Sequence, residues 1–210
     1  MKENNWFDPF YIQSHLNEEE SNIQKNVRDF CNNELKPTVV ERNRKNEFDQ
    51  SLYPKFGSLG VLGQTVKTHG GSGTSNLAYG LVAYEFEKID SSYRSSISVQ
   101  SSLVIHPINE FGSQEQKDKY LPPLIKGEKI GCFGLTESEA GSDPTSMKTS
   151  FKKTKDGYII NGSKNWITNA PIADIFIIWA IEENKDHKSI KGFIIEKNTE
   201  GLNTSTIENK

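Results

Sequence analysis

Apolar residues recur at every third or fourth position through much of the first half of the chain, and this spacing predicts helices. The clearest helix begins at Asn17, which forms a capping-box pattern with Glu20, and its apolar stripe ends before Pro37. Further helices are predicted at about residues 49–60, 75–90, 92–106 and 113–121, with a glycine-rich connection at 63–75.

The second half of the chain changes to the alternating pattern of strands. Strands are predicted at 130–135, 149–154, 158–160, 163–168, 175–181, 191–196 and 202–207. Asn161-Gly162 is a strong hairpin signal between two of them. Helices followed by strands predict an α+β chain with two layers, and no Gly-x-Gly-x-x-Gly follows a strand to suggest a Rossmann site.

Composition narrows the function classes. The 210 residues carry a formal net charge of −3 and no long block of like charges, which argues against a nucleic-acid surface. Cys31 and Cys132 fit neither a disulfide framework nor a metal-ligand spacing, and the four histidines form no ligand pair, so we expect no metal site. No signal peptide or membrane-spanning run is evident, which predicts a cytoplasmic protein or one whose targeting segment has been removed.

Residues 131–143 are the first candidate site. A short apolar run that includes Phe133 gives way abruptly to Thr136, Gly141 and Ser142. Such a loop offers hydroxyls and free backbone N–H groups, which suit a cofactor with phosphates and a polar ring. An ordinary strand-to-turn junction explains the same pattern equally well.

The predicted strand at 163–168 is the second candidate. A period of two places Lys164, Trp166 and Thr168 on one face, so that a flat indole lies beside a hydroxyl. This pair suits a fused heteroaromatic ring, which needs stacking and one or two hydrogen bonds. A core tryptophan with an edge threonine is the alternative.

Arg94 is the third candidate, because it is the only formal charge between Asp90 and Glu110. At helical spacing it shares a face of small hydroxyl residues with Ser98, Ser101 and Ser102. A guanidinium on such a face can bind a carboxylate or a phosphate bidentately, whereas an ion pair with Asp90 or Glu87 is the alternative. Four carboxylates are candidate bases by residue type: Glu85, Glu87, Glu137 and Glu139. We expect all four, and the side chain of His69, to be solvated.

Two of these stretches together resemble the acyl-CoA dehydrogenases. The resemblance rests on two motifs, Gly-Leu-Thr-Glu-x-x-x-Gly-Ser-Asp at 134–143 and Asn-Gly-x-Lys-x-Trp-Ile-Thr-Asn at 161–169. The resemblance implies FAD, with Thr136 bonding the flavin ring, Trp166 packing against it and Ser142 near the pyrophosphate or the substrate. The implied cofactor-binding residues are Phe133, Gly134, Leu135, Thr136, Gly141, Ser142, Trp166, Ile167, Thr168, Asn169 and Ala170.

The helical half resembles the glutaryl-CoA dehydrogenase branch in particular, through Tyr93-Arg-Ser and the run at 98–107. This implies that Arg94, Ser95 and Ser98, with Glu87 nearby and Ser142, face the substrate. The implied reaction removes an α-proton from glutaryl-CoA, transfers a β-hydride to flavin N5 and releases CO2 to give crotonyl-CoA. It belongs to lysine and tryptophan degradation, and electrons pass to an electron-transfer flavoprotein.

The resemblance also implies two domains, a helical one over 1–128 and an antiparallel, barrel-like β-domain over 129–210. The family's proton-abstracting glutamate lies in a C-terminal helical domain that is absent from these residues, so we expect the 210 residues alone to be inactive. That domain makes most contacts of the family's tetramer. The expected location is the cytoplasm of a bacterium, or the mitochondrial matrix after transit-peptide removal. The alternatives are a short- or branched-chain acyl-CoA dehydrogenase and a non-catalytic binding fragment.

Overall fold

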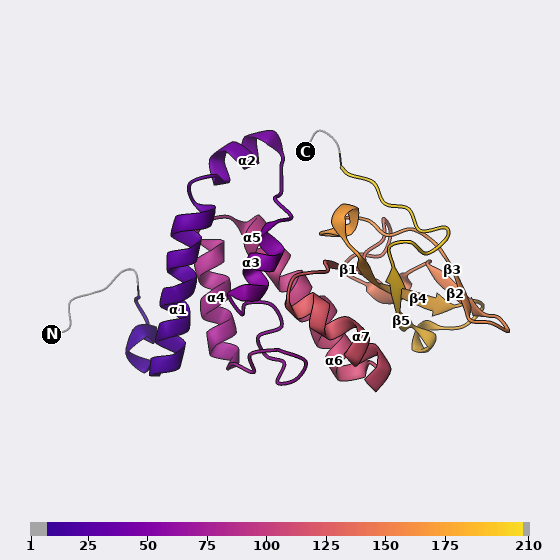
Figure 1. The fold of residues 1–210 in the computed structure, drawn as a ribbon. Coiled ribbons are helices and arrows are strands. Elements are labelled where there is room, and N and C mark those ends of the chain that lie inside the picture. Colours follow the sequence, from indigo (N-terminus) through magenta and orange to yellow (C-terminus); the bar gives the residue numbers. More distant parts are fainter. Residues whose placement is uncertain (1–7, 208–210) are drawn as a thin grey trace.

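The computed structural model describes residues 8–207, with a helical layer first and a sheet second (Figure 1). The expected order of helices followed by strands is therefore confirmed. Within the described residues, no helix is long and apolar enough to cross a membrane. The helices are α1 (Glu18–Phe30), α2 (Val39–Lys45), α3 (Leu52–Ser58), α4 (Asn76–Glu87), α5 (Ser91–Ser98), α6 (His106–Phe111) and α7 (Gln114–Ile125).

Local signals set several helix starts. Asn17 and Ser113 accept from the backbone N–H groups of Glu20 and Gln116, and both capping boxes are complete. Helix α7 continues past Pro122-Pro123 to Ile125, further than predicted, because buried Leu121 and Leu124 anchor its last turn in the core.

One long helical path runs from α5 to α6 through the π-helical segment Val99–Ile105, which has wider turns than an α-helix. A second π-helical segment, Cys31–Leu35, extends α1. The sequence predicted a single regular helix at 92–106, and the pattern gave no sign of α2.

The sheet has five strands: β1 (Gly131–Gly134), β2 (Ser150–Lys153), β3 (Tyr158–Asn161), β4 (Ile175–Glu182) and β5 (Lys191–Glu196). The hydrogen-bonded order is β1-β4-β2-β3, with β5 on β4. Pairs β2–β3 and β4–β5 are antiparallel, but β1–β4 and β2–β4 are parallel, so the sheet is mixed and not antiparallel throughout. Strands β2 and β5 both pair with β4, and the rings of Phe151 and Phe193 meet edge to face with their centroids 4.9 Å apart.

Two of the predicted strands are wrong. Residues 163–168 form an irregular segment, because Trp166 has a φ of 62°, in the left-handed region that strands do not use. The hairpin expected at Asn161-Gly162 is therefore absent. Residues 202–207 pair with no strand among the described residues.

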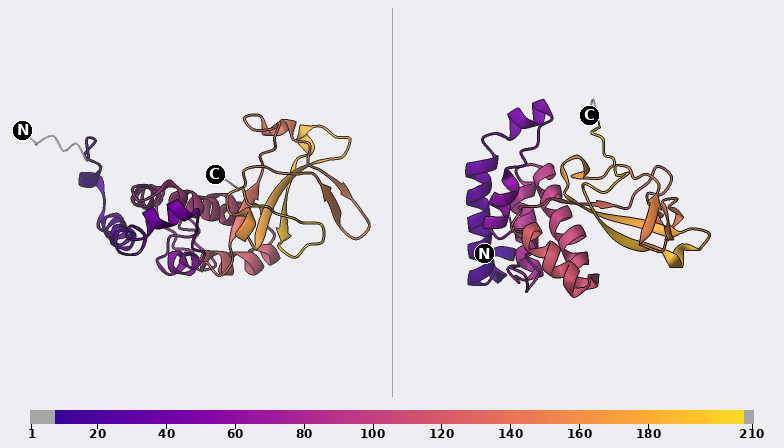
Figure 2. Two further views of the ribbon diagram at one scale, coloured as in Figure 1. Left: turned by 90° about the horizontal axis from the view of Figure 1, so that it is seen from above. Right: turned by 45° about the vertical axis from the view of Figure 1, so that its right-hand side comes forward.

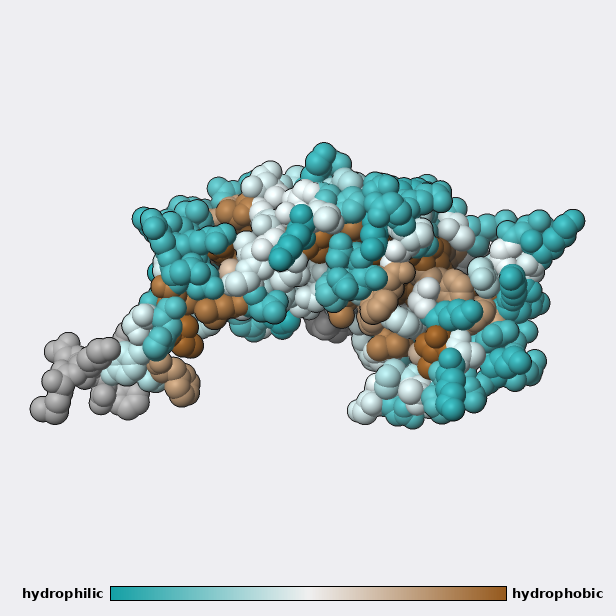
Figure 3. Space-filling model, turned by 90° about the horizontal axis from the view of Figure 1, so that it is seen from below, coloured by the Kyte–Doolittle hydropathy of each residue, from teal (hydrophilic) through white to brown (hydrophobic). Residues whose placement is uncertain are grey.

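Helices and sheet share one hydrophobic core. Ile130, Ile175 and Ile177 belong to the same buried cluster as Val104 and Leu124 of the helical part. The sheet projects to one side of the helical layer (Figure 2). The space-filling view from below shows a hollow between the helical layer and the sheet, with apolar residues exposed on both sides of it (Figure 3). The core therefore fixes the sheet against the helices.

Candidate functional site

The structure brings together the two motifs that lie about thirty residues apart in the sequence. The loop that follows β1 runs beside the irregular segment 163–170. The backbone N–H of Asn165 donates to the carbonyl oxygen of Thr136 at 2.9 Å, and Lys164 Nζ donates to the carbonyl oxygen of Leu135 at 3.0 Å. The motifs thus form one surface.

A buried ion pair fastens this surface from within. Lys164 Nζ lies 2.7 Å from Glu137 Oε1, and the two side chains are only 8% and 9% exposed. The Glu137 carboxylate also accepts from the backbone N–H groups of Lys148 at 2.6 Å and Thr149 at 3.0 Å. Burial by itself raises the pKa of Glu137, but the bonds from Lys164, Thr149 and Lys148 outweigh it and lower the pKa to about 2. The expectation of a solvated Glu137 is therefore wrong, and this carboxylate is a fixed anion.

Trp166 is the most unusual residue of the surface. Its side chain is 71% exposed, and its backbone holds a left-handed conformation that costs a non-glycine residue about 1–2 kcal/mol. The alternative of a core tryptophan is therefore wrong. Thr168 is exposed too, although the two residues do not share a strand face. What distinguishes Trp166 from other exposed aromatic residues is its left-handed backbone and its position next to the loop that follows β1.

The residues behind Trp166 are apolar and packed. Phe133 of β1 is half-buried and meets Trp179 of β4 edge to face, with ring centroids 5.9 Å apart. Ile167 and Ala170 pack on the small buried cluster around Phe176. These residues form a rigid backing for the exposed ones.

The expected cofactor residues divide into two groups. Some are open to solvent, and others are buried or already hydrogen-bonded within the protein. Gly141 and Ser142 are exposed, and a Cβ on Gly141 would meet nothing within 4 Å. Gly134 is buried, since a Cβ there would lie 2.5 Å from Ile178 Cδ1, and half-buried Leu135 gives its carbonyl to Lys164. Asn169 donates from Nδ2 to the carbonyl oxygen of Gly131 at 3.2 Å.

Arg94 is paired with Glu87 across α5 and α4. The Nε–Oε2 distance is 2.7 Å, with the side chains 38% and 45% exposed. Bonds from the Ser91 hydroxyl and then from Arg94 lower the pKa of Glu87. Asp90 instead bonds Ser92 N–H, so the alternative of an Asp90 pair is wrong. Neither terminal nitrogen of Arg94 has a partner among residues 8–207.

The hydroxyls near Arg94 do not all share its face. Ser95 and Ser98 are half-buried, and Arg94 and Ser98 line a small cavity between α4 and α5. Tyr79 OH lies 2.7 Å from Ser102 Oγ at this place. Ser101 is instead buried, and its hydroxyl accepts from a backbone N–H at 3.1 Å, because the π-helical turn rotates it out of the expected stripe.

Two more side chains that were expected to be solvated are held by partners. Glu85 is 2% exposed and bonds Arg28 at 2.9 Å. The His69 side chain is 15% exposed, with its ring nitrogens 2.8 Å from Thr68 Oγ1 and 2.9 Å from Asp118 Oδ1. Glu139 and Glu87 are exposed as expected, but each carries an ion pair, Glu139 with Lys148.

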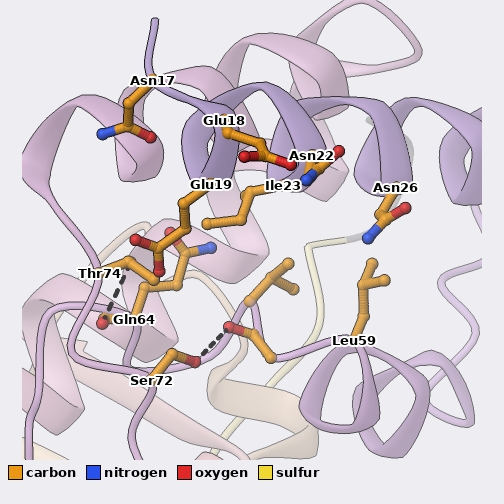
Figure 4. Close-up of a pocket in the computed structure, with 12 residues that line it drawn as sticks. Asn17, Glu18, Glu19, Asn22, Ile23, Asn26, Leu59, Gln64, Ser72 and Thr74 are labelled. Atoms are coloured by element: carbon orange, nitrogen blue, oxygen red, sulfur yellow. Dashed lines mark hydrogen bonds between the residues drawn. The ribbon is translucent and has the colours of Figure 1, made fainter.

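A larger cavity of about 780 Å³ lies elsewhere, at the start of α1 (Figure 4). It is lined by α1 and by residues of the 59–74 connection, and it contains none of the expected cofactor or substrate residues. The candidate site is therefore the exposed surface around Trp166, with Arg94 on the helical layer.

Sequence reasoning missed Gln100, which connects the helices to this surface, and Tyr53, which connects α3 to α5. Gln100 is fully buried, and its amide oxygen accepts from Gly131 N–H at 2.7 Å. Tyr53 OH lies 2.6 Å from Ser96 Oγ of α5. The only sequence signal for Gln100 is a lone amide in an uncharged segment of serines and apolar residues that follows α5.

Comparisons with known proteins agree with both motifs. A family model of the acyl-CoA dehydrogenase N-terminal domain matches residues 17–128, and one of the middle domain matches residues 132–210. A short-chain-specific acyl-CoA dehydrogenase of Clostridium acetobutylicum is 40% identical over 197 residues, which cover 93% of this chain and 52% of that protein. A mitochondrial isovaleryl-CoA dehydrogenase of Pongo abelii is 38% identical over 196 residues, covering 90% and 46%.

Among solved structures, a glutaryl-CoA dehydrogenase from Mycobacterium smegmatis in complex with FADH2 superposes with a TM-score of 0.91. It is 39% identical, and the match covers 96% of this chain and 51% of that one. The chain thus spans about half the length of the relatives that it matches.

Proposed function

We propose that this chain, which belongs to the acyl-CoA dehydrogenase family, binds FAD and carries part of the active site of a flavin-dependent acyl-CoA dehydrogenase. The observation that carries the proposal is the exposed Trp166, held in a left-handed conformation directly after Asn165, whose backbone N–H bonds the Thr136 carbonyl. An exposed indole near two threonines without a side-chain partner among the described residues fits a fused heteroaromatic ring.

In this proposal Trp166 stacks on the isoalloxazine, while the hydroxyls of Thr136 and Thr168 bond its polar edge. The exposed backbone at Gly141 and Ser142 approaches the pyrophosphate, since nothing blocks that approach. FAD, when bound, accepts the hydride that leaves the β-carbon of the acyl-CoA. The apolar backing by Phe133 and Ile167 excludes water from the strand behind the ring.

We further propose glutaryl-CoA as the substrate. Glu87 binds Nε of Arg94, and the two terminal nitrogens have no partner among residues 8–207, so they can bind a second carboxylate. Ser95 and Ser98 lie on the same helix, and the similarity to the glutaryl-CoA dehydrogenase supports this choice. Short-chain and isovaleryl-CoA dehydrogenases are similarly identical, so a shorter or branched acyl group is the competing substrate.

The proton-abstracting base is proposed to lie outside these residues. Glu137 is held by Lys164, Glu85 by Arg28, Glu87 by Arg94 and Glu139 by Lys148. None of these four carboxylates is free to approach a substrate α-carbon without breaking its pair. An electron-transfer flavoprotein as electron acceptor and a homotetramer remain proposals from the family resemblance.

The cofactor proposal is tested by FAD titration of the full-length protein. W166A should weaken FAD binding about tenfold, because a lost aromatic stack is worth about 1.5 kcal/mol. F111A removes an aromatic side chain that is 85% exposed at the end of α6 and should leave the affinity unchanged. Equal affinity of W166A and wild type would reject the proposed stacking.

The substrate proposal is tested by steady-state kinetics with glutaryl-CoA and butyryl-CoA. R94Q should lower kcat/KM for glutaryl-CoA about 10- to 100-fold, the range of a lost charged hydrogen bond, with little effect on butyryl-CoA. R44Q changes an exposed arginine of α2 and is the control. If wild-type protein turns over butyryl-CoA and not glutaryl-CoA, the competing substrate is correct.

A further inference from the structure

Gln100 joins the helical layer to the sheet. Its side chain is fully buried in the π-helical segment that continues α5. The amide nitrogen donates to the carbonyl oxygens of Leu124 at 3.0 Å and Lys129 at 2.9 Å, and the amide oxygen accepts from Gly131 N–H at 2.7 Å. Both donor hydrogens and the acceptor of this amide are thus used.

Gly131 continues this connection toward the candidate site. Its carbonyl oxygen accepts from Asn169 Nδ2 at 3.2 Å. Asn169 has a φ of 70° and directly follows Thr168. A Cβ on residue 131 would lie 2.5 Å from Val104 Cγ1, so glycine is needed for β1 to approach the π-helical segment this closely.

We propose that Gln100 is a positioning residue, which acts through Gly131 and Asn169 to fix residues 166–170 relative to the helix that carries Arg94. The inference rests on the proposed function, because it assigns residues 166–170 to the flavin and Arg94 to the substrate. The geometry gives it a direct route, since α5 and Gln100 belong to one unbroken helical path. Segments of π-helix are frequent at functional sites.

A second contact supports the same coupling. Tyr53 is fully buried, and its hydroxyl lies 2.6 Å from Ser96 Oγ of α5. Burial raises the pKa of Tyr53 to about 12, and the Ser96 and Asn169 side chains act in the opposite direction, so Asn169 lies near this hydroxyl. Asn169 is therefore bonded to β1 and lies near Tyr53 of α3, and both of these neighbours contact the path from Ser91 to Ile105.

The test uses Q100M, N169G and the double variant of the full-length protein. Glycine preserves the left-handed backbone of residue 169, and N184G, at an exposed left-handed asparagine without a side-chain partner among the described residues, is the matched control. Each single variant should weaken FAD binding about tenfold. The double variant should bind FAD no more weakly than the single variant with the lower affinity. N184G should bind FAD as wild type does.

Hydrogen exchange on the FAD-free protein gives a readout that does not depend on the cofactor. Both single variants should speed exchange in residues 163–171. N169G should also speed exchange of the Gly131 amide, and this result alone tests the coupling if Q100M does not fold. The proposal would be overturned if the loss of FAD affinity in the double variant equalled the product of the two single losses. Unchanged hydrogen exchange at these positions would overturn it too. A purely structural role would lower the melting temperature without changing the FAD affinity of folded protein, and that result also overturns it. Failure of wild-type protein to bind FAD would reject the proposed function, while the exchange data would still test the coupling.

Discussion

At the scale of single residues, the candidate site depends on a buried charge pair beneath an exposed ring. Glu137 and Lys164 are almost inaccessible; Lys164 also binds the Leu135 carbonyl of the first motif, and Glu137 binds the backbone N–H groups of Lys148 and Thr149. Trp166, which is 71% exposed, lies two residues after Lys164. The residue proposed to contact the flavin and the residues that form the buried pair are therefore different ones.

Replacing Lys164 by methionine should destabilise the protein by about 3 kcal/mol, because the Glu137 carboxylate would stay buried without its partner. K148M removes the exposed partner of Glu139 and should cost far less, because solvent screens that pair. Urea unfolding of the two variants measures the difference. Similar losses for both variants would contradict the importance of burial.

Glu137 should also make stability depend on acid. Its folded pKa of about 2 lies below the ordinary value of 4.5, so the unfolded chain takes up the proton first. The contribution is complete above pH 4.5 and is lost as the pH falls toward 2. Urea unfolding across this range should show a steeper decline for wild type than for E137Q. Parallel curves would mean that the pKa of Glu137 is not lowered in the fold.

The residue types at the site could be predicted from the sequence, but their geometry could not. Thr136, Trp166 and Thr168 were expected to face a ring, and Trp166 and Thr168 are exposed. The predicted strand is wrong, because Trp166 is left-handed and its neighbours Asn165 and Lys164 bond the distant loop at Thr136 and Leu135, which a local pattern does not contain. Burial of Glu137 was hidden for the same reason.

At the scale of elements, helix starts were predictable and helix interiors were not. The capping boxes at Asn17 and Ser113 are local, so the sequence places them correctly. The π-helical segment after α5 depends on packing against β1, and it shifts Ser101 away from the expected stripe. Its approach to the sheet requires a glycine at residue 131.

Two glycine-to-alanine changes should have opposite effects on stability. G131A places a methyl group against Val104 and should cost about 1–3 kcal/mol, and V104A in the same protein should relieve the clash. G80A lies in α4 with nothing within 4 Å of the new Cβ, so it should stabilise the helix by about 0.5–1 kcal/mol. Thermal unfolding of G131A, of G131A combined with V104A, and of G80A measures the predicted loss, its relief and the predicted gain of stability. A G131A protein as stable as wild type would contradict the close approach of β1.

At the scale of the whole molecule, the helices and the sheet are expected to unfold together. Ile130, Ile175 and Ile177 share a buried cluster with the helices, and Tyr120 OH of α7 bonds Glu196 of β5 at 2.9 Å. Far-ultraviolet circular dichroism, which follows the helices, should give the same melting temperature as fluorescence of Trp179 in β4, measured in a variant with Trp6 and Trp166 replaced by phenylalanine. Two separate transitions would show that the layers are energetically independent.

The shared core also explains how one chain can carry the surface proposed for FAD on the sheet and the arginine proposed for the substrate on a helix. Trp166 and Arg94 come from different layers, yet Gln100 connects the two layers through Gly131. The most direct test of this account mixes the FAD-loaded full-length protein with glutaryl-CoA in the absence of oxygen and follows the visible absorbance of the flavin. The account predicts that the yellow band bleaches with wild-type protein and bleaches about 10- to 100-fold more slowly with R94Q at subsaturating glutaryl-CoA. A band that persists with wild-type protein, for glutaryl-CoA and for butyryl-CoA alike, would contradict it.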